Sequence, residues 1–244
     1  MKLKLTLSLL ILAFLSGCTP NMGDDVNTII NKSIEVSGMN NLDGKEISFV
    51  FRGKEYQSTR QQGRFELKRI IKDSVVIEDI LNNDSFKRLV DGKPVQMADT
   101  TSNKLKNSVN SVHYFAYLPF GLDGASVNKE LLGKTDIKGK SYFKIKVWFD
   151  QEGGGEDFED VFLYWINLET YKVDYLAYEY HVNEGGMRFR EAYNRRTIEG
   201  IDFVDYKNYK PANKDADLLE LDKLFNEDKL ELLSKIDLEN VQVQ

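Results

Sequence analysis

The chain has 244 residues and a formal charge of −6 at pH 7, and 41% of its residues are hydrophobic, including 14 Phe, 12 Tyr and 2 Trp. A chain of this length with so many aromatic side chains can bury a sizeable apolar core in one folded unit. Its acidic balance argues against a nucleic acid partner and against electrostatic docking on anionic lipid. A single cysteine excludes an intrachain disulfide.

The first 17 residues have the pattern of an export signal. Two lysines precede the apolar run Leu5–Phe14, which is too short for a membrane span of about 20 residues. The letters LSGC that follow, ending at Cys18, resemble the lipobox of bacterial lipoproteins. The resemblance implies lipid transfer to Cys18 and cleavage before it. We therefore expect a lipoprotein signal peptide over residues 1–17 and a lipidated tether over residues 18–23.

The anchor sets the expected location. Because the chain is acidic, its attachment to a membrane has to come from acyl chains, and two or more chains hold stably. Thr19 occupies the position where the lipoprotein sorting rule places an aspartate for retention in the inner membrane. Its absence favours the outer membrane. We expect a monomer in the cell envelope, lipid-anchored through Cys18.

Alternating apolar residues predict a mainly β fold with a few helices (α+β). The stretch Val161–Val182 begins with a strand that is apolar on both faces, which is typical of a strand in the middle of a sheet. A turn at Asn167–Lys172 leads to a second Tyr-rich strand. Further strands are expected, between Gly, Asn and Asp turn signals, at 46–52, 54–60, 64–71, 74–81, 85–90, 134–138, 141–150, 186–198 and 200–209. This spacing predicts a large curved antiparallel sheet or unclosed barrel of about 10–11 strands.

Apolar stripes at helical spacing predict the helices. The first carries Ile29, Ile30 and Ile34 on one face and stops at Gly38. The others are expected at Ser102–Ala116, near Ser126–Leu132, and in a charged C-terminal segment over about 213–236, as Asp215–Phe225 and Glu227–Ile236. No linker or repeat divides residues 24–244, so we expect a single domain.

The loop Gln151–Asp160 is rich in glycine and carboxylates. Oxygen ligands on a flexible backbone suit Ca²⁺, and Glu152, Asp157 and Asp160 are the candidate ligands. Their spacing does not match the calcium-loop motif. Asp157 with Asp160 could also form an acid–base pair, but nothing sets their pKa values apart. A solvated hairpin loop is the simpler interpretation, and we expect no metal or cofactor.

Catalytic motifs are absent from the sequence. Two histidines, His113 and His181, in separate elements cannot fill a zinc site without other ligands, and no HExxH or CxxC spacing exists. No serine lies in a GxSxG elbow, and the lipid occupies Cys18. His113 fits a hydrogen-bonded packing residue better than a catalytic base. An enzyme of unknown reaction is therefore only the third alternative.

Two arginines form the most informative polar pair. Arg188 and Arg190 share a strand face, and Tyr178 and Tyr180 share a face of the preceding strand. On a concave surface, the two guanidiniums could bind an anionic head group, such as a carboxylate or phosphate. Alternatively, the arginines pair across strands with glutamates. Those glutamates are Glu179, Glu184 and Glu191.

The element order of one helix, about five strands, a helical interruption, about six strands and final helices is similar to that of the lipoprotein-carrier (LolA/LolB-like) half-barrel family. Segments around Asn110–Phe115, Gly153–Trp165 and Arg188–Asn194 also resemble a family of uncharacterised bacterial lipoproteins. The resemblance implies an unclosed barrel with helices packed on its concave side. It carries no catalytic residues across.

These observations predict a membrane-anchored lipoprotein that binds a lipid or another hydrophobic ligand in the concave face of a half-barrel. The candidate ligand-binding residues are His113, Tyr114, Trp148, Trp165, Tyr178, Tyr180, Arg188 and Arg190. The alternative is a non-enzymatic scaffold or partner-binding lipoprotein, in which the helices fill the concavity completely.

Overall fold

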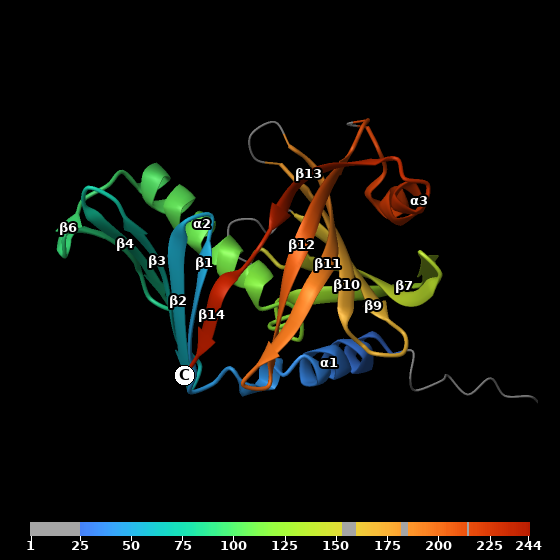
Figure 1. Ribbon diagram of the computed structural model, residues 1–244, viewed down its shortest axis with the longest axis horizontal. Coiled ribbons are helices and arrows are strands. Elements are labelled where there is room, and N and C mark those ends of the chain that lie inside the picture. The colour runs from blue at the N-terminus through green and yellow to red at the C-terminus, as the bar shows by residue number, and fades with distance from the viewer. Residues whose placement is uncertain (1–24, 153–159, 182–184, 214) are drawn as a thin grey trace, which may run out of the picture.

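The computed structural model describes residues 25–152, 160–181, 185–213 and 215–244, which form two curved antiparallel sheets of seven strands (Figure 1). The signal and tether predictions lie outside these residues. The first sheet has the strand order β14-β1-β2-β3-β4-β5-β6. Its strands are β1 (Glu46–Phe51), β2 (Lys54–Gln61), β3 (Arg64–Lys72), β4 (Val76–Asn82), β5 (Phe86–Val90), β6 (Lys93–Val95) and β14 (Glu239–Val243).

The second sheet has the order β13-β12-β11-β10-β9-β8-β7. Its strands are β7 (Val127–Ile137), β8 (Lys140–Phe149), β9 (Val161–Asn167), β10 (Val173–Tyr180), β11 (Gly186–Ile198), β12 (Ile201–Pro211) and β13 (Leu230–Ile236). Because β13 pairs with β12 and β14 pairs with β1, the C-terminal strands carry the chain from one sheet to the other. The outer strands β6 and β7 end the two sheets, so the barrel is unclosed.

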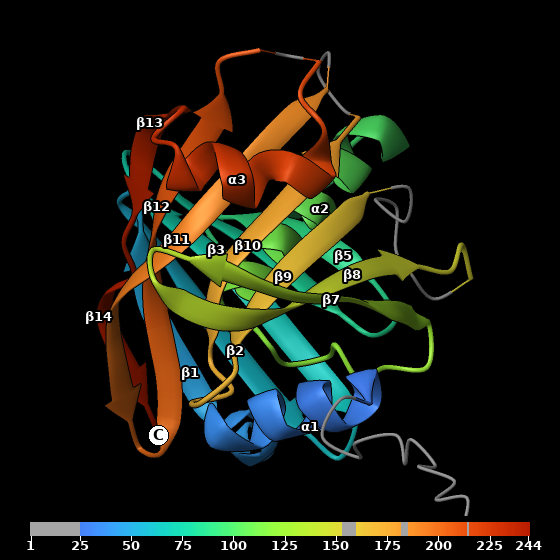
Figure 2. The same cartoon turned by 90° about the vertical axis from the view of Figure 1, so that its right-hand side faces the viewer.

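Helix α2 (Asp99–Ala116) lies between the two sheets, and we call the sheet faces that are turned toward it the inner faces (Figures 1 and 2). It packs on the first sheet, where Val109 is buried against Leu67 and Leu81. The Nη1 of Arg69 in β3 also donates a hydrogen bond of 2.8 Å to the Ser108 Oγ of the helix. The predicted fold class, a mainly β unclosed barrel with helices packed on its concave side, is confirmed, although the described residues form 14 strands in two sheets where about 10–11 were expected.

A buried ion cluster in the first sheet holds Arg69 in place. Asp79 is fully buried and accepts hydrogen bonds from the Nη2 of Arg69 at 2.6 Å and from the Nε of Arg88 at 2.7 Å. Burial opposes the ionisation of Asp79, but the hydrogen bonds from both arginines outweigh it and lower the pKa of the carboxyl. The cluster therefore stays charged, and it fixes the strand that carries the contact with α2.

Helix α1 (Val26–Val36) closes one end of the space between the sheets (Figure 2). The expected stripe of Ile29, Ile30 and Ile34 is buried. After the helix, Gly38 has φ +70°, and a Cβ there would lie 1.8 Å from the carbonyl oxygen of Gly200. Glycine is therefore required both for the left-handed backbone and for the close approach of two chain segments.

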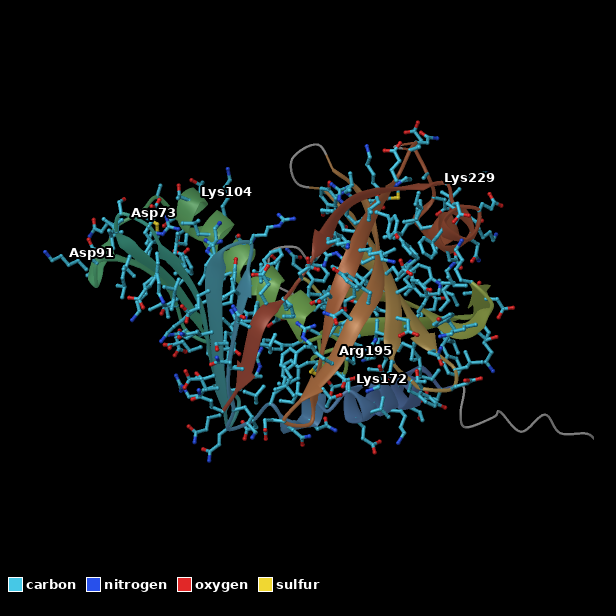
Figure 3. All side chains as sticks on the ribbon, in the orientation of Figure 1. Asp73, Asp91, Lys104, Lys172, Arg195 and Lys229 are labelled. Atoms are coloured by element: carbon cyan, nitrogen blue, oxygen red, sulfur yellow. The ribbon has the colours of Figure 1, made fainter. Side chains whose placement is uncertain are left out.

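An ion cluster joins α1 to the second sheet. The Nζ of Lys172 donates to the carbonyl oxygen of Val36 at 2.5 Å and to the carboxylate of Asp202. Arg195 lies beside them, and its Nη1 is 3.7 Å from the same carboxylate of Asp202 (Figure 3). These contacts fix the helix at the base of the barrel. Among the described residues, no helix combines the length and the hydropathy that a membrane crossing requires.

The strand β9 is covered on both faces, as its sequence predicts. Its inner face contributes Phe162, Tyr164 and Ile166 to the core cluster between the sheets. On the other face, Leu163 and Trp165 pack in a second cluster under η3 (Leu218–Glu220) and α3 (Leu221–Asn226). The predicted hairpin turn at Asn167–Lys172 joins β9 to β10.

The helix predicted near Ser126–Leu132 is wrong, because this segment belongs to strand β7. Val127 and Leu131, four residues apart, both pack on the inner cluster. A spacing of four residues places side chains on one face of a helix and also on one face of a strand. An irregularity in the pairing between Leu131 and Gly133 then leaves Leu132 exposed.

The C-terminal helix prediction over about 213–236 is correct only at η3 and α3. Residues 230–236 form strand β13 and not a helix. The pairing of β13 with β12 is irregular between Asn208 and Tyr209, so one residue of β13 bulges out. As a result, Leu230 packs on the outer cluster and Ile236 packs on the inner one. Because of this bulge, the apolar residues of β13 do not alternate strictly along the sequence, and their spacing resembles that of a helix.

Candidate functional site

A groove of about 880 Å³ lies between α2 and the inner face of the second sheet. Side chains of α2 form one wall and β8 to β13 form the other, and Phe51 and Arg52 at the end of β1 complete the lining. Figure 3 shows Lys104, which lines the groove from the N-terminal half of α2. The remaining space on the inner faces, toward α1, is filled by buried residues such as Ile30, Leu122 and Phe203. The concavity is therefore partly filled and partly open.

The middle of the groove is apolar and aromatic. Its lining includes Phe51, Val112, Phe115, Phe149, Phe162, Val204, Ile236 and Leu238. The rings pack on one another, with Tyr178 lying 5.4 Å from Phe115 and 5.6 Å from Phe162 between ring centroids. These rings expose a hydrophobic surface on both walls, which an apolar ligand could cover.

Two hydroxyl groups lie beneath this surface. The hydroxyls of Tyr114 on α2 and Tyr164 on β9 share a hydrogen bond of 2.6 Å. Burial raises the pKa of Tyr114 and raises the pKa of Tyr164 well above its ordinary value. Both phenols therefore stay neutral. The pair satisfies two polar groups in an apolar wall and ties α2 to the second sheet.

Beside these rings the groove has a polar, cationic part formed by β11, which we call its polar end. Arg190 of β11 is 8% exposed. Its Nη2 donates to the Tyr178 hydroxyl at 2.8 Å, and its guanidinium carbon lies 3.8 Å from the centroid of the Phe115 ring. Arg188 lies two residues away on the same strand, 5.1 Å from the centroid of the Tyr180 ring, and its Nη1 donates to the Met187 carbonyl oxygen at 2.7 Å.

The predicted pairing of these arginines with glutamates is not found in the described part of the chain. Glu191 instead accepts hydrogen bonds from Lys207 at 3.1 Å and from the Tyr209 hydroxyl at 3.0 Å. Glu179 forms no ion pair with either arginine, and Glu184 lies outside the described residues. Asp160 also lines the groove.

The structure brings together five of the eight predicted ligand-binding residues. These five groove-lining residues are Tyr114, Tyr178, Tyr180, Arg188 and Arg190. They converge because β10 and β11 are adjacent, with Tyr178 opposite Arg188 and Tyr180 opposite Gly186 in the ladder. The alternation of strand side chains then places all four strand residues on the inner face.

The other three predicted residues do not line the groove. His113 lies on the opposite side of α2, fully buried against Phe49 and Tyr56 of the first sheet. Trp148 points outward from β8, where Lys146 lies 5.4 Å from its ring. Trp165 points to the outer cluster, and its Nε1 donates to Asp222 at 3.4 Å. Strand parity accounts for both tryptophans, because Phe149 next to Trp148 and Tyr164 next to Trp165 pack on the inner cluster.

His113 has the packing role that its sequence context favours. Its Nε2 donates to the carbonyl oxygen of Lys68 at 3.1 Å. Its Nδ1 is buried and has no hydrogen-bond partner. Burial lowers the pKa of the imidazole to about 3. The ring is therefore neutral at physiological pH and contacts no solvent from which a substrate could approach.

The calcium prediction finds no support in the described ranges, where no three His, Cys, Asp or Glu side chains are grouped to hold a metal ion. Glu152 lies in a turn and is exposed. Asp160 belongs to the wall of the groove. Asp157 lies outside the described residues.

Sequence reasoning missed several polar residues of the groove, and two of them lie beside the arginines. Asn208 and Tyr206 of β12 both line it, and Asn208 lies directly opposite Arg190 in the ladder. The Oδ1 of Asn208 is buried without a hydrogen-bond partner. The sequence predicts that residues 186–198 and 200–209 form a hairpin. Aligning its two strands across the turn would have placed Tyr206 and Asn208 beside the arginines.

Together, the strand order and the groove define a mainly β half-barrel whose concave side holds one helix and an open, partly aromatic groove. The chain belongs to a family of unknown function, DUF6503, whose model matches residues 4–239. No curated protein matches the chain. The half-barrel architecture that its sequence resembles is confirmed by the arrangement of the sheets.

Solved structures with a similar chain path include a LolA superfamily protein from Nitrosomonas europaea, with 10% identity, a TM-score of 0.48 and coverage of 88% of this chain and 91% of that chain. Another is a putative outer membrane lipoprotein-sorting protein domain from Vibrio parahaemolyticus, with 8% identity, a TM-score of 0.44 and coverage of 88% and 93%. A third is a DUF1329 family protein from Desulfovibrio piger, with 9% identity, a TM-score of 0.43 and coverage of 90% and 93%. These values concern the fold alone.

Proposed function

We propose that this protein is a lipoprotein of the cell envelope that binds a lipid or another hydrophobic molecule in the groove between α2 and the second sheet. In this proposal the acyl chains on Cys18 attach it to the membrane, and the absence of an inner-membrane retention aspartate at position 19 favours the outer membrane. The observation that carries the proposal is the groove itself, about 880 Å³ in volume and lined by aromatic rings. Ligand pockets in proteins measure about 300–1,000 Å³ and are mostly apolar.

The size of the groove is sufficient for useful affinity. Burial of one methylene group contributes about 0.8 kcal/mol, and a micromolar dissociation constant corresponds to about 8 kcal/mol. Roughly ten buried methylenes would therefore contribute this free energy of about 8 kcal/mol, before the entropic costs of binding are subtracted. An acyl chain of ordinary length has enough methylenes. The groove alone is therefore sufficient, and the filled part of the concavity near α1 does not need to open.

The groove can be tested by filling it. Ser111 lines the groove from α2 and is half-buried, so the substitution Ser111→Trp places a large ring in the ligand volume. The full chain carrying Cys18→Ala is titrated with a neutral fluorescent naphthylamine dye. We expect micromolar binding by the parent protein and at least about tenfold weaker binding by Ser111→Trp, which corresponds to 1.4 kcal/mol or more.

Asn103→Trp is the matched control, because Asn103 is exposed on the same helix and does not line the groove. This variant should bind the dye as the parent does. If the parent binds no dye, or if Ser111→Trp binds it equally well, the groove is not a binding site. The scaffold alternative, in which the protein contacts a partner through its outer surface, would then account better for the fold.

A further inference from the structure

The proposed function leaves the polar end of the groove unexplained. Arg190 is more than nine-tenths buried, yet its Nε has no hydrogen-bond partner among the described residues. Buried polar groups are nearly always paired, so this unpartnered donor in the groove requires an explanation.

Other arginines of the second sheet form ion pairs with carboxylates. Arg195 bonds the carboxylate of Asp174 at 3.2 Å, and Arg196 bonds that of Asp205 at 3.1 Å. Arg190 instead has a phenol hydroxyl and an aromatic face, and Arg188 has a neighbouring carbonyl and an aromatic face. No ion pair joins either arginine to a carboxylate in the described ranges.

A buried cation without an anion is costly, because desolvation removes the water that would otherwise stabilise it. Both arginines lie at the same end of the groove, two residues apart on one strand face. An oxyanion at this end would supply the missing charge. The planar guanidinium fork binds a carboxylate through two parallel N–H···O bonds, and the vacant Nε of Arg190 is one of its donors.

We propose that the polar end of the groove binds the carboxylate head of a single-chain amphiphile such as a fatty acid. This inference rests on the proposed function and names its ligand class. Arg190 and Arg188 donate hydrogen bonds to the carboxylate oxygens of the head. The hydrocarbon tail lies along Phe115 and Phe162 in the apolar middle of the groove.

The test compares three probes of equal chain length: hexadecanoic acid, hexadecanol and hexadecyl phosphate. The full chain carrying Cys18→Ala is titrated with each in competition with the neutral dye. Charge-assisted hydrogen bonds give the acid an expected advantage of about tenfold or more over the alcohol. Arg190→Met and Arg188→Met should each reduce this ratio of acid to alcohol affinity at least threefold.

Arg64→Met is the matched control, because Arg64 is exposed and pairs with Asp84 far from the groove. It should leave all three affinities unchanged. Arg188→Met keeps the proposal testable if Arg190→Met fails to fold, because among the described residues Arg188 bonds only the carbonyl oxygen of Met187 and stacks on the ring of Tyr180.

Each remaining outcome has a distinct meaning. Equal binding of acid and alcohol by the parent would overturn the head-group proposal and leave the groove as a binding site. A phosphate preferred over the carboxylate by tenfold or more would overturn the carboxylate assignment in favour of a phosphorylated lipid head. Binding of none of the probes and no binding of the dye would overturn the proposed function itself.

Discussion

Protonation of His113 should destabilise the fold at mildly acidic pH. The imidazole is fully buried between α2 and the first sheet, with ring centroids 5.6 Å from Tyr56 and 5.9 Å from Tyr117. Its Nε2 hydrogen is used by the Lys68 carbonyl oxygen, and its Nδ1 has no acceptor for a second proton. A charged ring at this position would have neither solvent nor an anion beside it.

The sign of the effect follows from the two pKa values. Burial lowers the pKa of His113 to about 3 in the folded protein, whereas an unfolded histidine has a pKa of about 6.5. The unfolded state therefore binds more protons between these values, so the stability is complete above pH 6.5 and declines as the pH falls. At about 1.4 kcal/mol per pH unit, the loss between pH 6.5 and 4.5 is about 2–3 kcal/mol.

The assay is urea unfolding of the parent and of His113→Gln at pH 7.5, 6.5, 5.5 and 4.5. Glutamine retains a donor for the Lys68 carbonyl but does not titrate, so its stability should fall by about 2–3 kcal/mol less over the acidic range. His181→Gln, at an exposed position, should follow the parent. A difference between parent and His113→Gln of under about 1 kcal/mol would refute the reasoning.

Two further substitutions test the contacts that position the groove, both measured by urea unfolding at neutral pH. Asp79→Asn leaves two arginines without their charge partner and should cost about 3 kcal/mol, whereas Asp84→Asn at an exposed ion pair should cost under about 1 kcal/mol. Gly38→Ala forces a Cβ against the Gly200 carbonyl oxygen and should cost over about 2 kcal/mol. Gly53→Ala has the same φ of +70° with open space around it, so it should cost only about 1 kcal/mol; equal costs within either pair would contradict the account.

Much of the fold could be predicted because strand periodicity reports burial directly. The two apolar faces of β9 predicted its central place, and the stripe of α1 predicted its buried side. The shared face of Arg188 and Arg190 likewise followed from alternation. To predict that these arginines lie beside Tyr178 it is enough to pair β10 with β11, because the two strands are consecutive in the sequence and adjacent in the sheet.

The remaining features depend on long-range pairing that local patterns do not record. Leu230 and Ile236 fall on opposite faces of β13 only because its pairing with β12 is irregular. Trp165 was assigned to the ligand site for its chemistry, although its parity already opposed that of Phe162. The lipid anchor on Cys18 and the loop residue Asp157 lie outside the described residues, so these remain predictions.

Native mass spectrometry tests the central claim most directly. The Cys18→Ala protein is purified without detergent from a lipid-containing host and sprayed from a volatile buffer. Our account predicts an added mass equal to a single-chain lipid on the parent and on Asn103→Trp, and its loss on Ser111→Trp. A parent protein that carries no added mass and takes up no lipid when incubated with hexadecanoic acid or hexadecanol would contradict it.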